Sequence, residues 1–405
     1  MKQLLSMANP NTNQQKALKK LETLGLPTKK NEEYRYFDIE NILSKEWERF
    51  EANTQDIKES QNIIIHNGVV VNMPKDKGII FEYSSEIDID EEHFDPIYYL
   101  GHTLNKTHIK IRFTKDCRVV IRHINSINDK FISYRTALYF DKNVKVDIVE
   151  FIEDLDTDNS LMLLGSDIFV SSKAEVSLVR ERTAKKNGLI AISSDRVNVD
   201  KNALFSYHTF DFGDGKGLNL VKAKLDEEAK INSYHLLFAR DKANIGNISK
   251  IIHAGKNSKS TQKAKNILQG VAKGIFDALI KINNLAPKSI THQNSQAVLL
   301  NDGAFMASKP QLEIYIDDVE ASHGSTIGEL DADQLFYLRS RGINKENARK
   351  LLILAFANEM IDVIEDKLIR ETLHCSFDKV YHNKPQVECI ATCHHCEEMV
   401  LKEDS

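Results

Sequence analysis

Hydrophobic and polar residues alternate with different periods in different parts of the chain. Near the start, Ala17, Leu18, Leu21 and Leu24 lie at helical spacing, and Gly25 and Pro27 follow them. This pattern predicts a helix that ends at Gly25. From about residue 61, short runs of β-branched residues alternate with polar turns, which predicts strands at Ile63–Ile65, Val69–Val71, Ile79–Phe81, Ile109–Phe113 and Val119–Ile121.

A faint internal repeat runs through the middle of the chain. Each copy has a charged turn, a small or β-branched residue and then alternating apolar positions. Val144, Ala174, Ala203 and Ala229 occupy the same place in successive copies and are 30, 29 and 26 residues apart. Stacked strands at such a period indicate a β-solenoid or a layered β-sandwich, with chance similarity among amphipathic strands as the alternative.

The pattern becomes helical again after Asp331. Asp331 is a suitable N-cap for a helix that ends at Gly342, and Asn344 can cap a long helix over residues 346–373. Residues 351–357 are apolar on nearly every side of this helix, so it either packs on two sides or docks a partner. We therefore expect a helical region at 1–60, a β core at 61–331, a helical region at 332–375 and a tail at 376–405.

Composition and charge exclude several classes of protein. The 405 residues include 54 basic and 59 acidic side chains, and the net charge of −5 argues against nonspecific binding to nucleic acid. No apolar stretch approaches the roughly 20 residues that span a bilayer, and the N-terminus has no signal-peptide pattern. We expect a cytoplasmic protein with no nucleic-acid or membrane partner.

The common catalytic and nucleotide-binding motifs are missing from the sequence. There is no GxxxxGK(S/T), no GxGxxG after a strand, no GxSxG and no HExxH. The glycine-rich run 213–217 lacks the Ser/Thr and the helix that a phosphate loop needs, which favours a β-hairpin loop. These absences give no support to an enzyme.

One histidine has an unusual setting. His208, His235, His253 and His292 are isolated on predicted strands, where histidines are usually structural. His323 lies in the polar stretch IDDVEASHGSTIGELD, near Asp317, Asp318 and Glu320, and is followed by Gly324 and Gly328, which allow tight turns. A neutral imidazole there would suit iron or zinc.

The tail concentrates soft ligands. Four of the five cysteines lie in the last 31 residues, so a disulfide framework does not hold the core. A metal or cluster contact is one interpretation of the tail, and a reduced tail without a metal is the other. The candidate ligands, of which about three could face one ion, are Cys389, Cys393, His394, His395 and Cys396.

Several segments resemble one known family. The run KPQLEIYIDDVEASHGSTIGELDADQLFYLRSRGI (309–343) is similar to the SufB/SufD family of iron–sulfur cluster assembly proteins, and especially to its SufD branch. LGLPTKKNEEYRY (24–36) resembles the N-terminal segment of that branch, and residues 265–282 and 292–304 resemble its late β coils.

The resemblance implies a mainly β fold, with a right-handed parallel β-helix core between helical N- and C-terminal regions. It implies a non-catalytic scaffold subunit that pairs with SufB and binds the ATPase SufC through its C-terminal helices, while a cysteine desulfurase system supplies sulfur. The isolated chain would bind no cofactor tightly, and without SufB two copies of it could pair as a homodimer. By position, the SufC-docking candidates are Leu335, Phe336, Tyr337, Arg339, Arg341, Leu352 and Phe356.

The resemblance also implies a role for His323 as a ligand of a transient iron–sulfur cluster in the complex with SufB. Many relatives have a cysteine two residues earlier, where this chain has Ala321. Two alternatives stay open at this point: a β-helix enzyme that acts on a polysaccharide, and a structural protein with a C-terminal zinc or cluster module.

Overall fold

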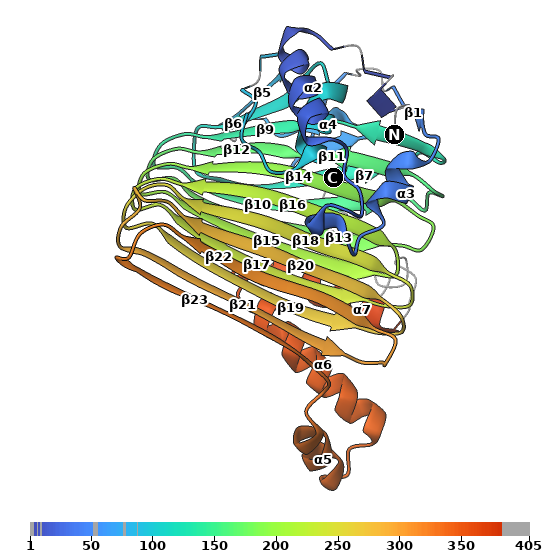
Figure 1. Cartoon of the computed structure of the whole chain (residues 1–405). Coiled ribbons are helices and arrows are strands. Elements are labelled where there is room, and N and C mark those ends of the chain that lie inside the picture. Colours follow the sequence, from blue (N-terminus) through green and yellow to red (C-terminus); the bar gives the residue numbers. More distant parts are fainter. Residues whose placement is uncertain are drawn as a thin grey trace.

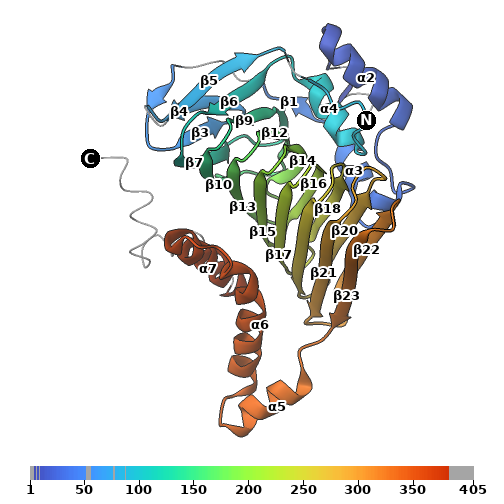
Figure 2. The same ribbon diagram turned by 90° about the vertical axis from the view of Figure 1, so that its left-hand side faces the viewer.

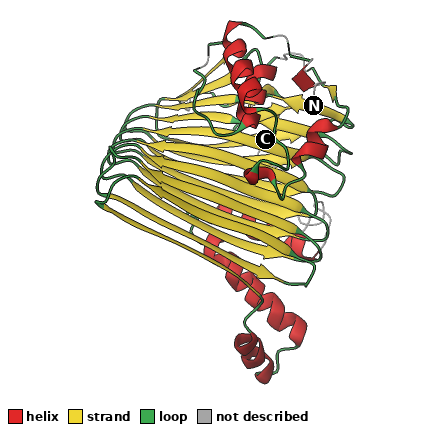
Figure 3. Ribbon diagram, viewed as in Figure 1, coloured by secondary structure: helices red, strands yellow, loops and turns green. Residues whose placement is uncertain are grey.

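The computed structural model describes residues 4–382 apart from 6, 9, 52–55, 76–77 and 87, and the side chain of Asn13. Its central feature is a tall stack of strands, with the N-terminal helices at one end and the C-terminal helices along one side (Figures 1 and 2). Strands dominate the molecule, as Figure 3 shows. The predicted mainly β fold with flanking helices is confirmed.

Two sheets face each other along the stack, and from residue 166 onward successive strands alternate between them. In the described residues, sheet I has the order β22 (Phe305–Ile314), β20 (Lys273–Ile282), β18 (Asn244–His253), β16 (Lys216–Leu225), β14 (Ile190–Val199), β12 (Ser166–Val170), β9 (Thr136–Phe140), β6 (His108–Phe113) and β5 (Ile79–Ser84). Joined to its side are β1 (Glu48–Arg49), β8 (Lys130–Ser133) and β11 (Leu161–Leu164).

Sheet II forms the opposite wall. Its order over the described residues is β2 (Lys58–Glu59), β4 (Val69–Met73), β3 (Ile63–His66), β7 (Cys117–Asn125), β10 (Lys145–Asp154), β13 (Glu175–Ala184), β15 (Leu204–Gly213), β17 (Lys230–Ala239), β19 (Lys259–Leu268), β21 (Ser289–Leu299) and β23 (Val319–Gly328). All the strands predicted from residue 63 to residue 121 are present as β3 to β7.

The internal repeat corresponds to the coils of a parallel β-helix. Neighbouring strands from β10 to β23 in sheet II pair in parallel, with Lys145 opposite Glu175, Glu175 opposite Leu204 and Leu204 opposite Lys230. These offsets equal the spacing of the repeated residues in the sequence. The solenoid prediction is confirmed, and the sandwich and chance-similarity alternatives are wrong, because each coil stacks in register on the one before.

Small or β-branched side chains fill the same corner of six successive coils. Val144, Ala174, Ala203 and Ala229 are at most 5% exposed, and Ser258 and Ser289 take the same place in the next coils with no exposure. The residue before each one has a left-handed backbone, which turns the chain sharply into the following strand. These left-handed residues are Asn143, Lys173, Asn202, Glu228, Asn257 and Lys288.

The glycine-rich run 213–217 is a corner of the β-helix. It leads from β15 in sheet II to β16 in sheet I, so the predicted hairpin loop is wrong. Gly213 has φ 122°, and a Cβ atom there would lie 2.0 Å from the carbonyl oxygen of Ala184. Glycine is required because the neighbouring coil leaves no room for a side chain.

The N-terminal region covers the outer face of sheet I. It comprises α2 (Thr12–Leu24), the short 3-10 helix η1 (Glu32–Tyr34), α3 (Ile39–Ser44) and α4 (Pro96–Leu104). Leu21, Phe37 and Trp47 pack with Tyr99 of α4 against Leu220 of β16. Helix α2 was predicted, but α4 was not, because it is short and lies within a stretch where the surrounding pattern is that of strands.

The C-terminal region comprises α5 (Ala332–Ser340), α6 (Lys345–Ile361) and α7 (Lys367–His382). The single helix predicted over 346–373 is wrong: α6 ends at Ile361, and Asp366 starts the next helix by accepting a hydrogen bond from the Ile369 N–H at 2.9 Å. Ile353 and Ala357 pack on the outer face of sheet II, whereas Leu351 is 47% exposed. Helix α6 therefore packs mainly on one side.

Within the described ranges, every helix is too short or too polar to cross a bilayer.

Candidate functional site

His323 lies on the last strand of the β-helix. Strand β23 pairs only with β21 among the described strands, so the interior opens beyond it. His323 is paired with Gln293, whose side chain points inward and donates hydrogen bonds to Gln262 Oε1 (2.8 Å) and to the Ala278 carbonyl of sheet I (3.0 Å). Paired residues of parallel strands share a face, so His323 points toward the open mouth of the interior.

A chain of polar side chains continues inward from His323. Below Gln293, Gln262 donates to Ser249 Oγ at 2.6 Å. Two residues after His323 on β23, Ser325 faces the interior too. It donates a hydrogen bond to Ser308 of sheet I at 2.9 Å, and Ser308 donates one to Ser295 at 2.8 Å. The histidine therefore stands at the rim of a hydrogen-bonded floor whose members hold one another in place.

The carboxylates expected near His323 are placed elsewhere. Glu320 is opposite Ile290 and points to the outer face, while Asp317 and Asp318 lie in the turn before β23. Within the described part of the chain, no ion pair or hydrogen bond joins His323 to any of them. The imidazole is exposed, and its role as a ligand stays a prediction.

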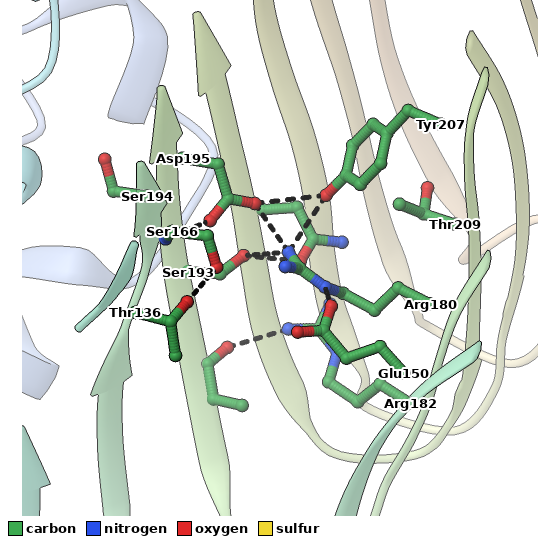
Figure 4. Close-up of polar contacts among 12 residues, drawn as sticks. Thr136, Glu150, Ser166, Arg180, Arg182, Ser193, Ser194, Asp195, Tyr207 and Thr209 are labelled. Carbon is green, nitrogen blue, oxygen red and sulfur yellow. Dashed lines mark hydrogen bonds and ion pairs between the residues drawn. The ribbon is translucent and has the colours of Figure 1, made fainter. Parts of the chain in front are cut away.

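Deeper in the β-helix, a buried ion-pair network crosses from one sheet to the other (Figure 4). The Arg180 guanidinium is hydrogen-bonded to Glu150, donates to Asp195 Oδ2 of sheet I at 2.7 Å and donates to Tyr207 Oη at 2.9 Å. All these side chains are at most about 3% exposed. Burial alone would raise the pKa of Glu150, but Arg180 and His123 hold it down at about 2.

This network was missed by the sequence reasoning, although a signal was present. Glu150, Arg180, Thr209 and His235 each lie six residues after a corner residue of their coil. They form one inward column, in register through β10, β13, β15 and β17. Polar residues at a fixed offset in a solenoid repeat indicate a polar interior.

A second buried polar cluster ties α4 to sheet I. Among the described residues, His102, His108 and Asp167 form the one group with the spacing of a metal site. However, Arg135 lies 3.0 Å from Asp167 Oδ2, and Arg196 lies 4.0 Å from its other oxygen. Two guanidinium groups beside one carboxylate oppose a divalent cation, so the cluster is an ion-pair network that joins α4 to β12.

Buried histidines make the fold sensitive to acid. Burial is the largest cause in lowering the pKa to about 3 for His93 and to about 4 for His102, His208, His235 and His253. Because the unfolded chain takes up protons near pH 6.5, this stability is complete above pH 6.5 and is lost as the pH falls through about 4. Burial raises the pKa of Glu181 to about 7. The protonated Glu181 therefore stabilises the fold at acidic pH, and this contribution is lost as the pH rises through 7.

We expect the free energy of unfolding, measured in urea, to fall steeply between pH 6.5 and pH 4. His253, which is fully buried between Ser258 and Ser260 at 2.8 Å from each hydroxyl, contributes about 3 kcal/mol of that fall. The His253→Gln variant should therefore show a smaller difference between the two pH values. An equally steep fall in the variant would contradict the assignment to His253.

The predicted docking residues divide into two groups. On α5, which has no buried residue and extends away from the β-helix (Figure 2), Phe336 is 74% and Tyr337 56% exposed. Leu335 is half-buried, and Arg339 and Arg341 are exposed. Leu352 and Phe356 on α6 are partly buried, and Phe356 packs under the Lys265 ammonium group at 4.2 Å from its ring.

The tail candidates Cys389, Cys393, His394, His395 and Cys396 lie outside the described residues. Their predicted contact with a metal or cluster stays a prediction.

Comparison with known proteins agrees with this architecture. The profile of the family described as "SUF system FeS cluster assembly, SufBD core domain" matches residues 122–356, which include most of the β-helix, β23, α5 and part of α6. The profile described as "SufBD protein N-terminal region" matches residues 3–78. The core match alone extends over more than half of the chain.

Curated relatives carry the same description. The iron–sulfur cluster assembly protein SufD of Escherichia coli (strain K12) is 39% identical over 112 residues, which are 28% of this chain and 26% of that protein. SufD of Bacillus subtilis (strain 168) is 23% identical over 340 residues, or 74% of this chain and 73% of that protein. SufD of Plasmodium berghei (strain Anka) is 27% identical over 254 residues, or 62% of this chain and 19% of that protein.

The matched segments span only about a quarter of the Escherichia coli relative and a fifth of the Plasmodium relative. The core profile, the N-terminal profile and the parallel β-helix between helical regions nevertheless agree on one assignment. The chain belongs to the SufBD family of iron–sulfur cluster assembly proteins.

Proposed function

We propose that this chain is a non-catalytic scaffold subunit of a cytoplasmic SUF-type complex. It pairs with a SufB-like chain at the open end of its β-helix, binds a SufC-like ATPase through its C-terminal helices and contributes to building a nascent iron–sulfur cluster. The cluster is cargo, and sulfur reaches the complex from a cysteine desulfurase system.

The observation that carries this proposal is the position of His323. An exposed imidazole stands at the mouth of the β-helix, on a strand whose free edge has no partner among the described strands. An unpaired strand edge offers a row of N–H and C=O groups to another chain. A partner that pairs with β23 would bring its own ligands next to His323, and the neutral imidazole is a good ligand for iron.

The polar floor below His323 supports the same role. Gln293 is held by Gln262 and by the Ala278 carbonyl, so the strand that pairs with β23 is fixed in register. A ligand on such a rigid strand needs little reorganisation when cargo arrives. The family membership favours this function over a polysaccharide-acting enzyme and over a structural protein with a zinc module.

Co-expression with the cognate SufB-like and SufC-like chains tests the proposal. The three proteins should elute together in one peak in size exclusion at moderate salt. This peak should be distinct from that of any homodimer of this chain. Elution of this chain without either partner under mild conditions would contradict the proposal.

The Phe336→Ala and Tyr337→Ala double variant should weaken binding of the SufC-like ATPase at least about tenfold, because exposed aromatic residues commonly carry most of the energy of an interface. The matched control is Leu285→Ala, which removes another exposed hydrophobic residue (75% exposed) from a distant turn. Titration of the ATPase against each variant measures the effect. Equal affinity of the double variant and the wild type would exclude docking at α5.

A further inference from the structure

A cavity lies between the outer face of sheet II and the connection from α6 to α7. Its volume is about 440 Å³, within the range of small-molecule sites. Strands β10, β13, β15 and β17 form its floor, while residues 363–366 and Ile369 form its roof. Figure 2 shows both helices along this side of the β-helix. An ion pair between Arg118 of β7 and Asp366 joins floor and roof.

A row of polar side chains crosses the cavity floor. Asp147, Ser177, Ser206 and Asn232 face the cavity from four neighbouring strands and are in register with one another. All four are half-buried. Within the described ranges, none of these side chains forms a hydrogen bond or an ion pair with the rest of the chain. The row therefore presents free donors and acceptors to whatever occupies the cavity.

His208 adds a buried donor or acceptor without a partner. It lies beside this row on β15, is 6% exposed and stacks on Tyr234 with ring centroids 5.0 Å apart. Its Nδ1 atom has no hydrogen-bond partner in the described structure. Burial lowers the pKa of His208 to about 4, so the ring is neutral at pH 7. Buried polar atoms are rarely left unpaired, which points to an occupant.

The charge of the lining indicates the sign of that occupant. Asp147, Glu175, Glu365 and Asp366 outnumber Arg118 and Lys145 around the cavity. Arg118 is already paired with Asp366, so its charge is compensated. Asp147 keeps an unpaired carboxylate on β10, at one edge of the floor, and burial raises the pKa of that group despite Lys145 and Arg118. A bound cation would offset the cost of burying this charge.

Tyr234 and the apolar side chains of Val179, Ile364 and Ile369 complete the lining. An apolar wall beside one carboxylate and several neutral polar groups suits an aliphatic chain that ends in an ammonium group. A bare metal ion is less suitable, because the one group of described residues with the spacing of a metal site, His102, His108 and Asp167, lies elsewhere.

We propose that this cavity is a binding site for a small aliphatic amine, whose ammonium group pairs with Asp147 and whose polar groups contact Ser177, Ser206 and His208 Nδ1. The site is separate from the mouth of the β-helix, so it goes beyond the proposed function and does not depend on it.

Isothermal titration of the full-length chain at pH 7 with putrescine and spermidine tests the site, and succinate serves as the anionic probe of similar length. At least one amine should bind saturably with one site per chain, and succinate should not bind. Asp147→Asn and His208→Phe should each weaken that binding about tenfold or more. The phenylalanine keeps the stacking on Tyr234 but removes the ring nitrogen.

Asp302→Asn is the matched control, because Asp302 is an exposed acidic residue in a turn at the far end of the stack. It changes the net charge as Asp147→Asn does and should leave amine binding unchanged. Absence of saturable amine binding, equal binding of succinate, or equal effects of the two Asp→Asn changes would each overturn the proposal. If His208→Phe fails to fold, the half-buried Asp147→Asn change still decides the result.

Discussion

Arg180→Leu is expected to lower the free energy of unfolding by about 3–5 kcal/mol, the largest stability effect of any single change proposed for this chain. The guanidinium lies between Glu150 of sheet II and Asp195 of sheet I and is 1% exposed. Its removal leaves Asp195 buried without a cation and leaves Glu150 with His123 as its remaining partner. Leucine restores only part of the lost volume and none of the hydrogen bonds to Ser193 and Tyr207.

Urea unfolding at pH 7, followed by circular dichroism, measures this loss. The matched control is Arg112→Leu, since Arg112 forms an exposed ion pair with Asp141 (2.7 Å) and its loss should cost far less stability than the loss of Arg180. A second test combines Arg180→Leu with Glu150→Gln and Asp195→Asn. The triple variant should recover stability relative to Arg180→Leu, because it removes the unpaired charges. Equal costs for the two single arginine changes would contradict a structural role for the network.

The repeat made the β-helix predictable from the sequence. Val144, Ala174, Ala203 and Ala229 occupy tight corners where the coils approach each other, so only small or β-branched side chains fit there. That steric limit appears in the sequence as a period. Stacking in register then follows, because each strand must place its apolar residues against those of the strand below.

Other features depend on contacts that the local pattern does not contain. Helix α4 is stabilised by Asp95 as an N-cap and by its burial against sheet I. Neither feature can be recognised from the sequence of a segment that is surrounded by strands. The break between α6 and α7 lets Ile353 of α6 and Phe377 of α7 both pack on the outer face of sheet II. The interior network joins residues of both sheets, and only the fold brings Arg180 to Asp195.

Within the candidate site, the sequence identified His323 but not its surroundings. Asp317, Asp318 and Glu320 lie near His323 in the sequence, yet strand alternation sends Glu320 to the opposite face. The groups that lie beneath His323 are instead Gln293 and Gln262, from coils that precede it by 30 residues and more. Their place below the histidine follows from the register of the β-helix.

His323→Ala is expected to reduce cluster formation by the reconstituted complex at least about tenfold, since a metal ligand matters at least as much as the groups that orient it. The side chain is exposed on the final strand, and none of its neighbours depends on it for a hydrogen bond in the described structure. The variant should therefore fold normally and keep its partners. Its thermal unfolding and its elution with the SufB-like and SufC-like chains should match the wild type.

His292→Ala is the matched control for this change. His292 is an exposed histidine on the neighbouring strand β21, paired with Ser322 in the ladder, but its side chain points to the outer face. Both variants remove one imidazole from the same end of the β-helix. Only the change at the mouth should affect the cluster.

The most direct test of the scaffold role is the amount of iron and acid-labile sulfide bound per complex after anaerobic reconstitution with a cysteine desulfurase, cysteine and ferrous iron. The wild type and His292→Ala should hold equal amounts, and His323→Ala should hold about a tenth or less while remaining in an intact complex. Equal iron and sulfide in all three complexes would contradict cluster assembly at the mouth of this β-helix.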